Sequence, residues 1–490
     1  MKRVSIIGSG IAGMSAACVM AEAGYDVTVI EKNDKPGGRI NVFEEKGFRF
    51  DMGPSWYWMP EVFENFYNRF GFKSSDFYEL RRLDPSYRVW FDDRGKMDIP
   101  ADFGELKEMF DKIEPGSGLK LEKFINHAKE KYDIGMSEFV WKPGQSIFEF
   151  ADIRVFRNFF RLQLFKSISN EIGKVVTNPQ LKQLLEFPVL FLGAAPADTP
   201  ALYSLMNYAD LKLGTWYPDG GMYKIAEAFY RIATSLGVKF EFNEAVRSFK
   251  YNNGNISHVI TDKSDYETDM VIANADYHHV DQEIVSPELA NYDNKYWEGR
   301  KMAPSSLLFF LGLDRKVKNL EHHNLFFDAD FDKHAGQIYH HPEWPEDPLF
   351  YVCCPSRTDN TVAPPGHENL FVLIPLAPDL PGETSERTDQ YLDIVIKRIK
   401  DATSVDISEH IVYKRHFGIR DFKSYYNSFK GNAYGLANTL FQTAILKPSI
   451  KSKKISNLYF TGQLTTPGPG LPPSVISGQV VANEVINDNK

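Results

Sequence analysis

The first residues of the chain alternate between short apolar runs and glycines. Residues 4–7 form a β-branched run that predicts a strand, and residues 14–23 are small or apolar helix formers that Gly24 ends. Residues 26–30 predict a second strand. A strand, a helix and a strand within roughly 30 residues form a β-α-β unit of a parallel sheet, so the start of the chain predicts an α/β fold.

Predicted strands and helices of the same kind recur in the middle and at the end of the chain. The later elements are a helix over residues 222–236, strands over 238–242, 258–261, 270–276 and 457–462, and a last helix over 474–486. Between them, residues 61–174 are predicted to be mostly helical, and residues 290–425 are mixed and rich in aromatic side chains. Because strand-and-helix pieces of the first type stand at the start, middle and end, we expect two discontinuous domains.

Composition and charge narrow the possible classes of protein. The 490 residues are 43% hydrophobic and 25% charged, as in ordinary globular proteins, and the net charge of −9 argues against non-specific nucleic-acid binding. Lys2 and Arg3 precede an apolar run that resembles a signal peptide, but glycines interrupt it. No other stretch has the ~18 uninterrupted apolar residues of a membrane span, so we expect a soluble or peripheral protein.

The cysteines and histidines show neither the pattern of a disulfide framework nor that of a metal site. The three cysteines, Cys18, Cys353 and Cys354, are odd in number and two are adjacent, which favours a reducing cytoplasm over a disulfide framework. We interpret Cys353 and Cys354 as buried strand residues, and the cysteines and histidines lack zinc-site spacing, so no metal is expected. The adjacent histidine pairs are expected in loops or at the surface, since neighbours on a strand point to opposite faces. These pairs are His278 and His279, His322 and His323, and His340 and His341.

A G-x-G-x-x-G motif, Gly8, Gly10 and Gly13, follows the first predicted strand and opens the helix, and Glu31 ends the next strand. In this context Gly8 allows the tight turn, Gly10 the approach of a pyrophosphate, and Gly13 close packing of helix on sheet. The phosphates then meet the positive end of the helix, and Glu31 can accept hydrogen bonds from a ribose hydroxyl. The motif predicts a dinucleotide cofactor.

Gly37, Gly38 and Arg39 follow the acidic residue, and this pairing resembles the second fingerprint of flavoprotein oxidoreductases related to glutathione reductase and amine oxidases. There the arginine helps to hold the phosphates or the ribose. A second G-x-G-x-x-G, which a separate nicotinamide domain would require, is absent from the sequence. The resemblance therefore favours bound FAD, reoxidised by oxygen or a quinone.

Four further segments complete a resemblance to the bacterial and fungal type of phytoene desaturase, flavoproteins that include carotenoid desaturases and isomerases. They are residues 50–59, 193–208, 214–222 and 459–478. The forms at 53–58 and 467–473 look most like those of flavobacterial members. Many other members carry a histidine and a Gly-rich triplet in the last loop, whereas this chain has Thr466 and Pro469, so any role of that histidine does not transfer.

The resemblance implies a Rossmann-like FAD-binding domain of the amine-oxidase and glutathione-reductase type with a discontinuous mixed α+β substrate domain. The FAD domain is expected over residues 1–75, 214–290 and 430–490, and the substrate domain, which also contacts the membrane, over 76–213 and 291–429. The implied cofactor contacts are Gly8, Gly10, Ala12, Gly13, Glu31, Lys32, Gly38, Arg39, Gly53, Val246, Gly462 and Gln463.

Catalytic and membrane-contacting residues follow less directly from the resemblance. Some members use an acidic residue and an arginine near the flavin, and the matching positions here are Glu149 and Arg154. A solvated helix glutamate is the alternative for Glu149, because charged residues are mostly exposed. Residues 148–168 mix arginines with phenylalanines, which suits a helix in a membrane interface, although a core-facing helix with snorkelling arginines has the same pattern.

The resemblance implies an FAD-dependent carotenoid desaturase, most simply one that converts 15-cis-phytoene to lycopene by successive removals of a hydride and a proton. It would dock peripherally on the cytoplasmic membrane. The alternatives within the family are a 1′-hydroxycarotenoid 3,4-desaturase and a carotenoid isomerase. A carrier of prenyl chains similar to the dissociation-inhibitor proteins would use the same fold without catalysis. The 14% aromatic content fits a large apolar surface for such a substrate.

Overall fold

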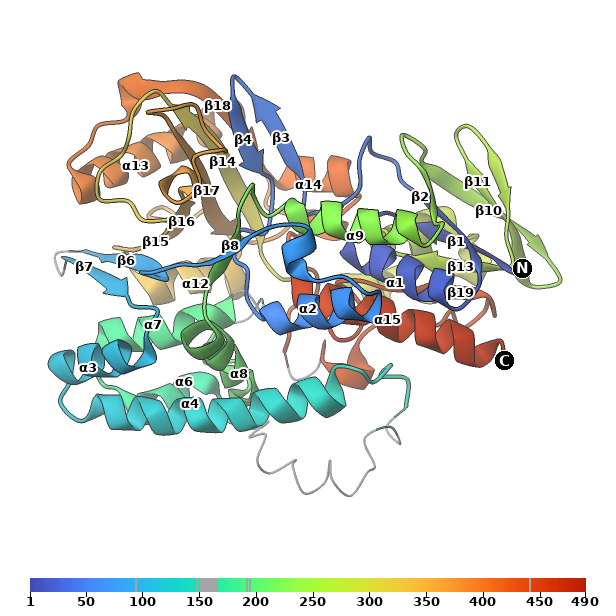
Figure 1. Cartoon of the computed structure of the whole chain (residues 1–490), viewed down its shortest axis with the longest axis horizontal. Coiled ribbons are helices and arrows are strands. Elements are labelled where there is room, and N and C mark those ends of the chain that lie inside the picture. Colours follow the sequence, from blue (N-terminus) through green and yellow to red (C-terminus); the bar gives the residue numbers. More distant parts are fainter. Residues whose placement is uncertain (93–94, 147–148, 150–165, 191–192, 194, 440–441) are drawn as a thin grey trace.

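The computed structural model describes residues 1–92, 95–146, 149, 166–190, 193, 195–439 and 442–490. Two β-sheets lie toward opposite ends of the molecule, and both chain termini lie beside the smaller one (Figure 1). Among the described residues, no helix is long and apolar enough to cross a membrane.

The sheet beside the termini has five parallel strands in the described part of the chain. In spatial order they are β19 (Leu458–Phe460), β13 (Met270–Ala273), β1 (Arg3–Ile7), β2 (Asp26–Ile30) and β9 (Lys239–Glu241). Ile6 of the central strand is in register with Ile272 on one side and Val29 on the other. The predicted β-α-β unit and the late strand are therefore confirmed, and strands far apart in the sequence form one sheet.

Helix α1 (Ile11–Glu22) packs between this sheet and the C-terminal helix α15 (Leu471–Asp488), with α9 (Lys224–Ser235) beside it. The contact between α1 and α15 depends on Gly478, where a Cβ would lie 2.2 Å from the carbonyl oxygen of Ala12. Both helices begin several residues earlier than the sequence pattern predicts, because their first turns contain glycine, proline or small residues that carry little periodic signal.

The second sheet has seven strands in the described part of the chain and joins segments from both halves of the sequence. In order they are β18 (Ile411–Phe417), β14 (Ser305–Leu313), β17 (Glu368–Leu376), β16 (Phe350–Cys353), β15 (His323–Phe327), β6 (Tyr87–Phe91) and β7 (Gly95–Ile99). The prediction that residues 61–174 are mostly helical is wrong for β6, β7 and the short strand β5 (Leu80–Arg82). These short strands form through pairing with distant partners, such as β6 with β15, which local periodicity does not reveal.

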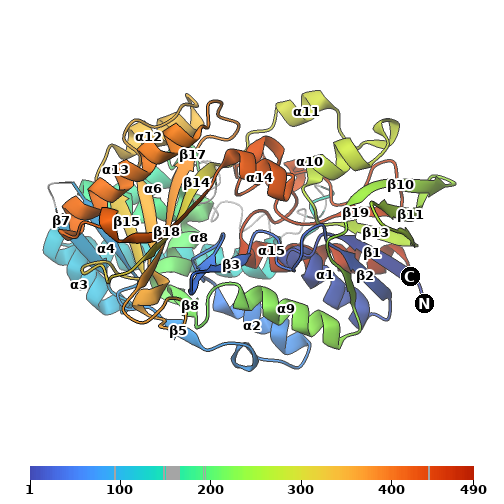
Figure 2. The ribbon, with the colours of Figure 1, turned by 90° about the horizontal axis from the view of Figure 1, so that it is seen from above.

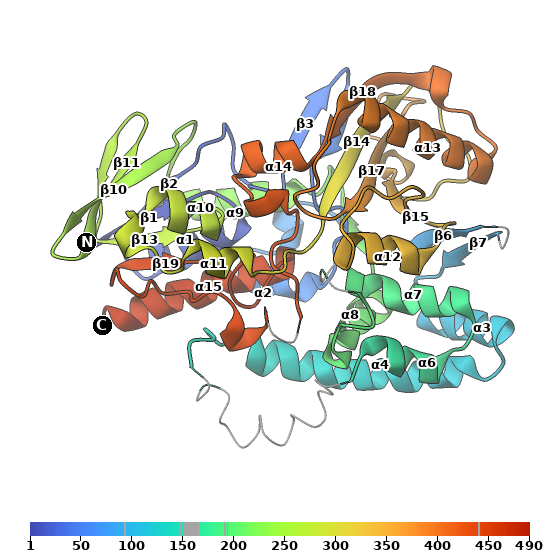
Figure 3. The same ribbon diagram turned by 180° about the vertical axis from the view of Figure 1, so that it is seen from behind.

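Both faces of the inner strands of the seven-stranded sheet are buried, whereas the edge strands β18 and β7 are partly exposed. Along β14, Leu307, Phe309 and Leu311 face helix α13 (Ser385–Thr403), while Leu308 and Phe310 belong to the larger core on the opposite side. On that side a helical layer lies below the sheet in Figure 1 and is seen from behind in Figure 3. It consists of α3 (Phe103–Ile113), α4 (Ser117–Ile134), α6 (Ile168–Val175), α7 (Pro179–Leu190), α8 (Leu205–Tyr208) and α12 (Phe331–Tyr339).

The remaining elements are short. Helix α14 (Ile419–Tyr426) lies between the two large sheets in the view of Figure 2. The meander β10 (Val246–Asn252), β11 (Asn255–Thr261) and β12 (Asp265–Glu267) lies at the outer end of the molecule, beside the parallel sheet (Figure 1). The others are the hairpin β3 (Val42–Glu45) and β4 (Phe48–Asp51), β8 (Trp216–Pro218) paired with β5, and helices α2 (Pro60–Arg69), α10 (Tyr277–His279) and α11 (Asn294–Glu298).

The placement of the histidine pairs corrects one prediction. His340 and His341 are exposed at the end of α12, as expected, but His322 and His323 are buried, with exposed fractions of 2% and 0%. The reason is that β15 is an inner strand of the seven-stranded sheet and is covered on both faces. His322 precedes the strand, so the alternation of faces does not hold between the two residues, and their ring centroids lie 4.5 Å apart.

Candidate functional site: a dinucleotide cleft beside an apolar cavity

A cleft of about 650 Å³ opens at the carboxyl ends of the central strands of the parallel sheet. Such strand ends, next to a helix N-terminus, are where open α/β sheets bind dinucleotides. Its wall includes residues of the first two strands and their loops, of the meander, of α14 and of the loop after β19. Those with polar or backbone groups to offer include Gly8, Gly10, Ala12, Glu31, Lys32, Gly38, Arg39, Asn274, Asp276, Tyr426, Gly462 and Gln463.

The glycine turn is shaped for close approach to the backbone. Gly8 has φ +94°, a conformation that favours glycine, and its N–H donates to the Ile30 carbonyl at 2.8 Å. A Cβ on Gly10 would lie 2.9 Å from Asn274 Nδ2, and that amide in turn donates to the Gly8 carbonyl. The first N–H groups of α1 have no partner within their own helix and face the cleft, so they are available to an anion.

Glu31 is the buried acid at the end of β2. Its Oε2 accepts hydrogen bonds from the backbone N–H and the hydroxyl of Ser9, both at 2.8 Å, and its Oε1 accepts from Asn33 N–H at 2.9 Å. These bonds fix the carboxylate at the cleft wall while each oxygen retains acceptor capacity. The arrangement fits a ribose hydroxyl.

Arg39 presents a buried positive charge to the cleft. Its Nη2 donates to Ser428 Oγ at 3.1 Å, and its guanidinium lies over the Tyr426 ring at 5.3 Å. Its Nε is buried without a hydrogen-bond partner among the described residues, and burial lowers the pKa of the guanidinium. A bound phosphate would neutralise the buried charge of Arg39 and accept a hydrogen bond from its Nε. The residues present therefore fit the FAD pyrophosphate.

Ten of the twelve predicted cofactor residues line the cleft; Gly13 and Gly53 do not. A Cβ on Gly13 would lie 2.3 Å from the Gly8 carbonyl oxygen, and one on Gly53 would lie 2.1 Å from the Arg39 carbonyl oxygen. Neither glycine touches the cleft. Each lacks a Cβ, so the backbone of Gly8 or of Arg39, which do line the cleft, can pack directly against it.

Other cleft residues were not predicted from the sequence. Asp276 follows β13, caps α10 by accepting from His278 N–H at 3.1 Å, and lies near Arg39. Burial raises the pKa of its carboxyl to about 6, and the Arg39 charge opposes that rise. Tyr425 and Tyr426 come from α14, in the segment that was expected to belong to the substrate domain. The polar end of the strand over residues 270–276 was a signal for Asp276, whereas α14 carries no motif.

A second, apolar cavity lies against the seven-stranded sheet. Its wall is mainly aromatic and aliphatic and comes from α7, α12 and strands β15, β16 and β17: Phe187, Leu325, Phe327, Phe331, Ala335, Ile338, Tyr351 and Leu373 are among the lining residues. Tyr434 also lines this cavity, and the next residue, Gly435, packs on Gln463, where a Cβ would lie 2.9 Å from the Gln463 carbonyl oxygen. Since Gln463 lines the dinucleotide cleft, one short stretch of chain connects the two sites.

Asp210 is a buried carboxyl behind the aromatic wall. It accepts a hydrogen bond from the Tyr87 hydroxyl at 2.8 Å, and the Tyr87 ring packs on Phe187 of the cavity at 5.6 Å. Burial raises the pKa of the Asp210 carboxyl to about 7. The group can therefore hold a proton near neutral pH.

Of the predicted catalytic pair, the structure describes Glu149. The Glu149 carboxylate accepts three backbone N–H bonds, from Gly144, Gln145 and Ser146, at 2.8–2.9 Å. These bonds hold the carboxylate against the backbone of residues 144–146. Arg154, and most of the predicted amphipathic helix over residues 148–168, lie outside the described residues, so the catalytic role of both side chains stays a prediction.

Comparisons with known proteins agree with this geometry. Residues 11–486 match the family of flavin-containing amine oxidoreductases. The chain is 40% identical over 486 residues to a carotenoid 3,4-desaturase of Haloarcula japonica, covering 99% of this chain and 98% of the relative. It is 29% identical to a zeta-carotene-forming phytoene desaturase of Myxococcus xanthus, covering 99% and 94% of the two chains.

Solved structures with the same fold include an oxidoreductase from Methanosarcina mazei and a variant of putrescine oxidase. Each superimposes with a TM-score of 0.63 at 14% identity, covering 98% and 99% of this chain, and 100% and 99% of theirs. The predicted fold class, FAD as cofactor and oxidoreductase activity are thereby confirmed. The chain belongs to the flavin-containing amine oxidoreductases and, within them, to the carotenoid desaturases, FAD-dependent enzymes that oxidise CH–CH bonds.

Proposed function

We propose that this enzyme introduces the 3,4 double bond of a carotenoid. The observation that carries the proposal is the 40% identity with the carotenoid 3,4-desaturase over nearly the whole of both chains, against 29% with the phytoene desaturase. The conversion of 15-cis-phytoene to lycopene, expected first from the sequence, is the second candidate, and an isomerisation without net oxidation is the third.

The residues of the two sites divide the work of desaturation. The flavin would supply the acceptor for the hydride that leaves the substrate carbon. The α1 N-terminus, Arg39 and Glu31 would hold the phosphates and the ribose, and so fix the position of the cofactor relative to the cavity. The aromatic wall around Phe187 and Tyr351 holds an apolar chain and keeps water away from the reacting carbons.

Chromatography of the products tests this proposal. Purified holoenzyme is incubated with liposomes that carry either a carotenoid saturated at C3–C4 or phytoene, with oxygen or a quinone as the acceptor in separate samples. A longer polyene from the first substrate alone supports 3,4-desaturation, and lycopene from phytoene supports the second candidate. Turnover that requires an added nicotinamide would contradict reoxidation by oxygen or a quinone.

We expect Ala335→Trp to abolish at least 90% of the desaturation, roughly a tenfold loss, while the enzyme retains its FAD. Ala335 lies on α12 and lines the apolar cavity, so an indole there fills space that the substrate chain needs. Lys333→Trp is the matched control, because Lys333 is exposed on the same helix. Equal loss of activity in both variants would place the substrate elsewhere.

We also propose peripheral docking on the cytoplasmic membrane, since a carotenoid is dissolved in lipid. Three large apolar side chains, Trp141, Ile445 and Leu446, are exposed, with exposed fractions of 42%, 37% and 46%. They come from two segments in contact, because a Cβ on Gly144 would lie 3.3 Å from the Ala444 carbonyl oxygen. Such side chains can enter a membrane interface.

Sedimentation with anionic vesicles tests the docking. We expect the double substitution Trp141→Ser and Leu446→Ser to weaken vesicle binding about 10-fold or more, because it removes two exposed apolar side chains that would enter the membrane. Leu119→Ser is the control, since Leu119 is 59% exposed at the opposite end of α4 from Trp141. Equal vesicle binding by both proteins would rule out this surface.

A further inference from the structure

A buried cluster beside the apolar cavity has no part in the function described above. His322, His323 and Cys353 are exposed by only 2%, 0% and 2%. A ring nitrogen of each histidine and the Cys353 Sγ all lie within 4.8 Å of one another. His322 precedes β15, His323 begins it, and Cys353 ends β16; the two strands pair directly, with His323 in register with Cys353.

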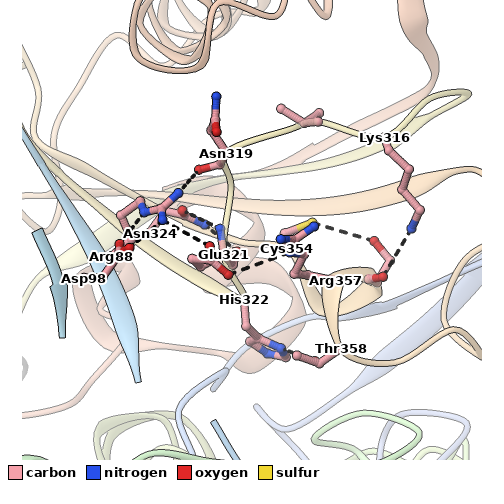
Figure 4. Close-up of polar contacts among 12 residues, drawn as sticks. Arg88, Asp98, Lys316, Asn319, Glu321, His322, Asn324, Cys354, Arg357 and Thr358 are labelled. Carbon is pink, nitrogen blue, oxygen red and sulfur yellow. Dashed lines mark hydrogen bonds and ion pairs between the residues drawn. The ribbon is translucent and has the colours of Figure 1, made fainter. Parts of the chain in front are cut away.

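The hydrogen bonds of the two histidines determine which nitrogen is free. His322 Nδ1 is 2.6 Å from Thr358 Oγ1, and Figure 4 shows this ring beside Thr358 and apart from the ion pairs of Glu321. His323 Nδ1 is 2.6 Å from Tyr351 Oη.

Each of these hydroxyls uses its own hydrogen elsewhere. Thr358 donates to the Pro355 carbonyl at 3.3 Å, and Tyr351 donates to Ser55 Oγ at 3.0 Å. The hydroxyl oxygens therefore accept from the imidazoles, which places both ring hydrogens on Nδ1 and leaves a lone pair on each Nε2. Neither Nε2 has a hydrogen-bond partner among the described residues.

This pattern matches the way proteins prepare histidines for metal binding. A ligating imidazole commonly donates its other N–H to a fixed acceptor, which holds the tautomer and the ring orientation. Trp56 stacks on His323 at 4.1 Å and Tyr217 packs on His322 at 4.5 Å, which limits how far the rings can turn.

We infer that His322, His323 and Cys353 bind one thiophilic metal cation, Zn²⁺ or Cu⁺. Bonds of ~2.0–2.3 Å place ligand atoms ~3.5–4 Å apart, so small rotations bring the three groups onto one ion. A thiolate with two imidazoles is a soft ligand set that suits these ions and not Mg²⁺ or Ca²⁺. No metal was expected because the cysteines and histidines lack the spacing of a zinc site in the sequence. Here the pairing of β15 with β16 brings the three residues together.

Charge balance is compatible with either ion. Metal binding displaces the proton of the Cys353 thiol to solvent and forms the metal–thiolate bond. The thiolate then neutralises Cu⁺ completely, and with Zn²⁺ one positive charge remains. Asp51 lines one small cavity together with Cys353, so its carboxylate is placed to offset part of that remainder. The bound ion would tie β15 to β16 and fix Tyr351 in the wall of the apolar cavity.

Metal analysis of the purified FAD-containing enzyme tests the inference. We expect one equivalent of zinc or copper per flavin by mass spectrometry, and the identity of the metal decides between the two ions. After removal of the metal with a chelator, titration with Co²⁺ should give absorption bands at longer wavelength than those of the flavin that saturate at one equivalent. Anaerobic titration with Cu⁺ against a competing chelator covers the case in which only copper binds.

Two cysteine variants provide the matched comparison. Cys353→Ser removes the thiolate, and Cys354→Ser alters the neighbouring buried cysteine, whose sulfur lies 3.7 Å from Ser356 Oγ in the opposite core of the sheet. We expect Cys354→Ser to retain the equivalent of metal and Cys353→Ser to lose it, with FAD content showing that both have folded. His322→Gln replaces Cys353→Ser if the latter does not fold. A wild-type enzyme that takes up neither Co²⁺ nor Cu⁺, or equal binding by the two serine variants, would overturn the inference.

Discussion

We expect Gly13→Ala to yield a protein that purifies without FAD. The added Cβ would lie 2.3 Å from the Gly8 carbonyl oxygen and 2.7 Å from Asn274 Nδ2. Neither group can retreat easily, because Gly8 is hydrogen-bonded to Ile30 and Asn274 to Gly8. The N-terminus of α1 must then move away from the sheet, and its N–H groups lose their aim at the pyrophosphate. The FAD affinity should fall by ~100-fold or more, which is about 2.7 kcal/mol.

Gly173→Ala is the control for that substitution. Gly173 is also a helical glycine, on α6, but no atom lies within 4 Å of its Cβ position. Alanine there should leave FAD binding unchanged and stabilise the helix by ~0.5–1 kcal/mol. Flavin absorbance of the purified proteins and titration of the FAD-free forms measure both effects. A Gly13→Ala enzyme that retains its flavin would show that α1 can shift without cost to the cofactor.

The β-α-β unit that forms the cofactor cleft could be predicted because the residues that specify it lie close together in the sequence. A strand, a glycine turn, a helix and an acid at a fixed distance specify the β-α-β unit, and Gly8, Gly10 and Glu31 lie where the motif requires them. The order of the remaining strands was not predicted, since β13 and β19 join β1 only through pairing across most of the chain.

The seven-stranded sheet depends on contacts between distant segments, which leave little periodicity in the local sequence. Strand β6 is buried at every position, so it lacks the alternation of a half-exposed strand, and it exists because β15 and β7 pair with it. The same distant pairing buries His323 and brings it to Cys353. Tyr426 reaches the cofactor cleft from a helix without any motif. Residues whose role arises from tertiary neighbours alone could not be identified beforehand.

The second large effect concerns Arg39. We expect Arg39→Gln to weaken FAD binding about 10- to 100-fold, because it removes a charged hydrogen bond to phosphate worth ~1.5–3 kcal/mol. Arg69→Gln is the control: Arg69 ends helix α2, pairs with Glu22 of α1 at 2.7 Å and is 32% exposed. Equilibrium titration of the FAD-free proteins, followed by flavin fluorescence, gives both dissociation constants. A similar loss of affinity in the two variants would assign the effect to overall charge.

The stability of the FAD-free enzyme separates a binding role of Arg39 from a structural one. Without a phosphate, Arg39 is a buried cation whose burial lowers its pKa and whose Nε has no partner among the described residues, so it costs stability. Arg39→Gln should therefore raise the melting temperature of the FAD-free form while it lowers that of the FAD-bound form.

The gain in melting temperature that Arg39→Gln gives the FAD-free form should depend on pH, because Asp276 titrates beside Arg39. The raised pKa of about 6 means that folding favours the protonated carboxyl, so the stability that this group contributes is complete below its unfolded pKa and is lost as the pH rises through 6. Arg39 reduces that loss by interacting with the carboxylate. The benefit of Arg39→Gln should therefore be largest below pH 6 and shrink above it. A variant that is destabilised without FAD at every pH, with unchanged affinity, would make Arg39 a structural residue and leave the phosphate to the α1 N-terminus alone.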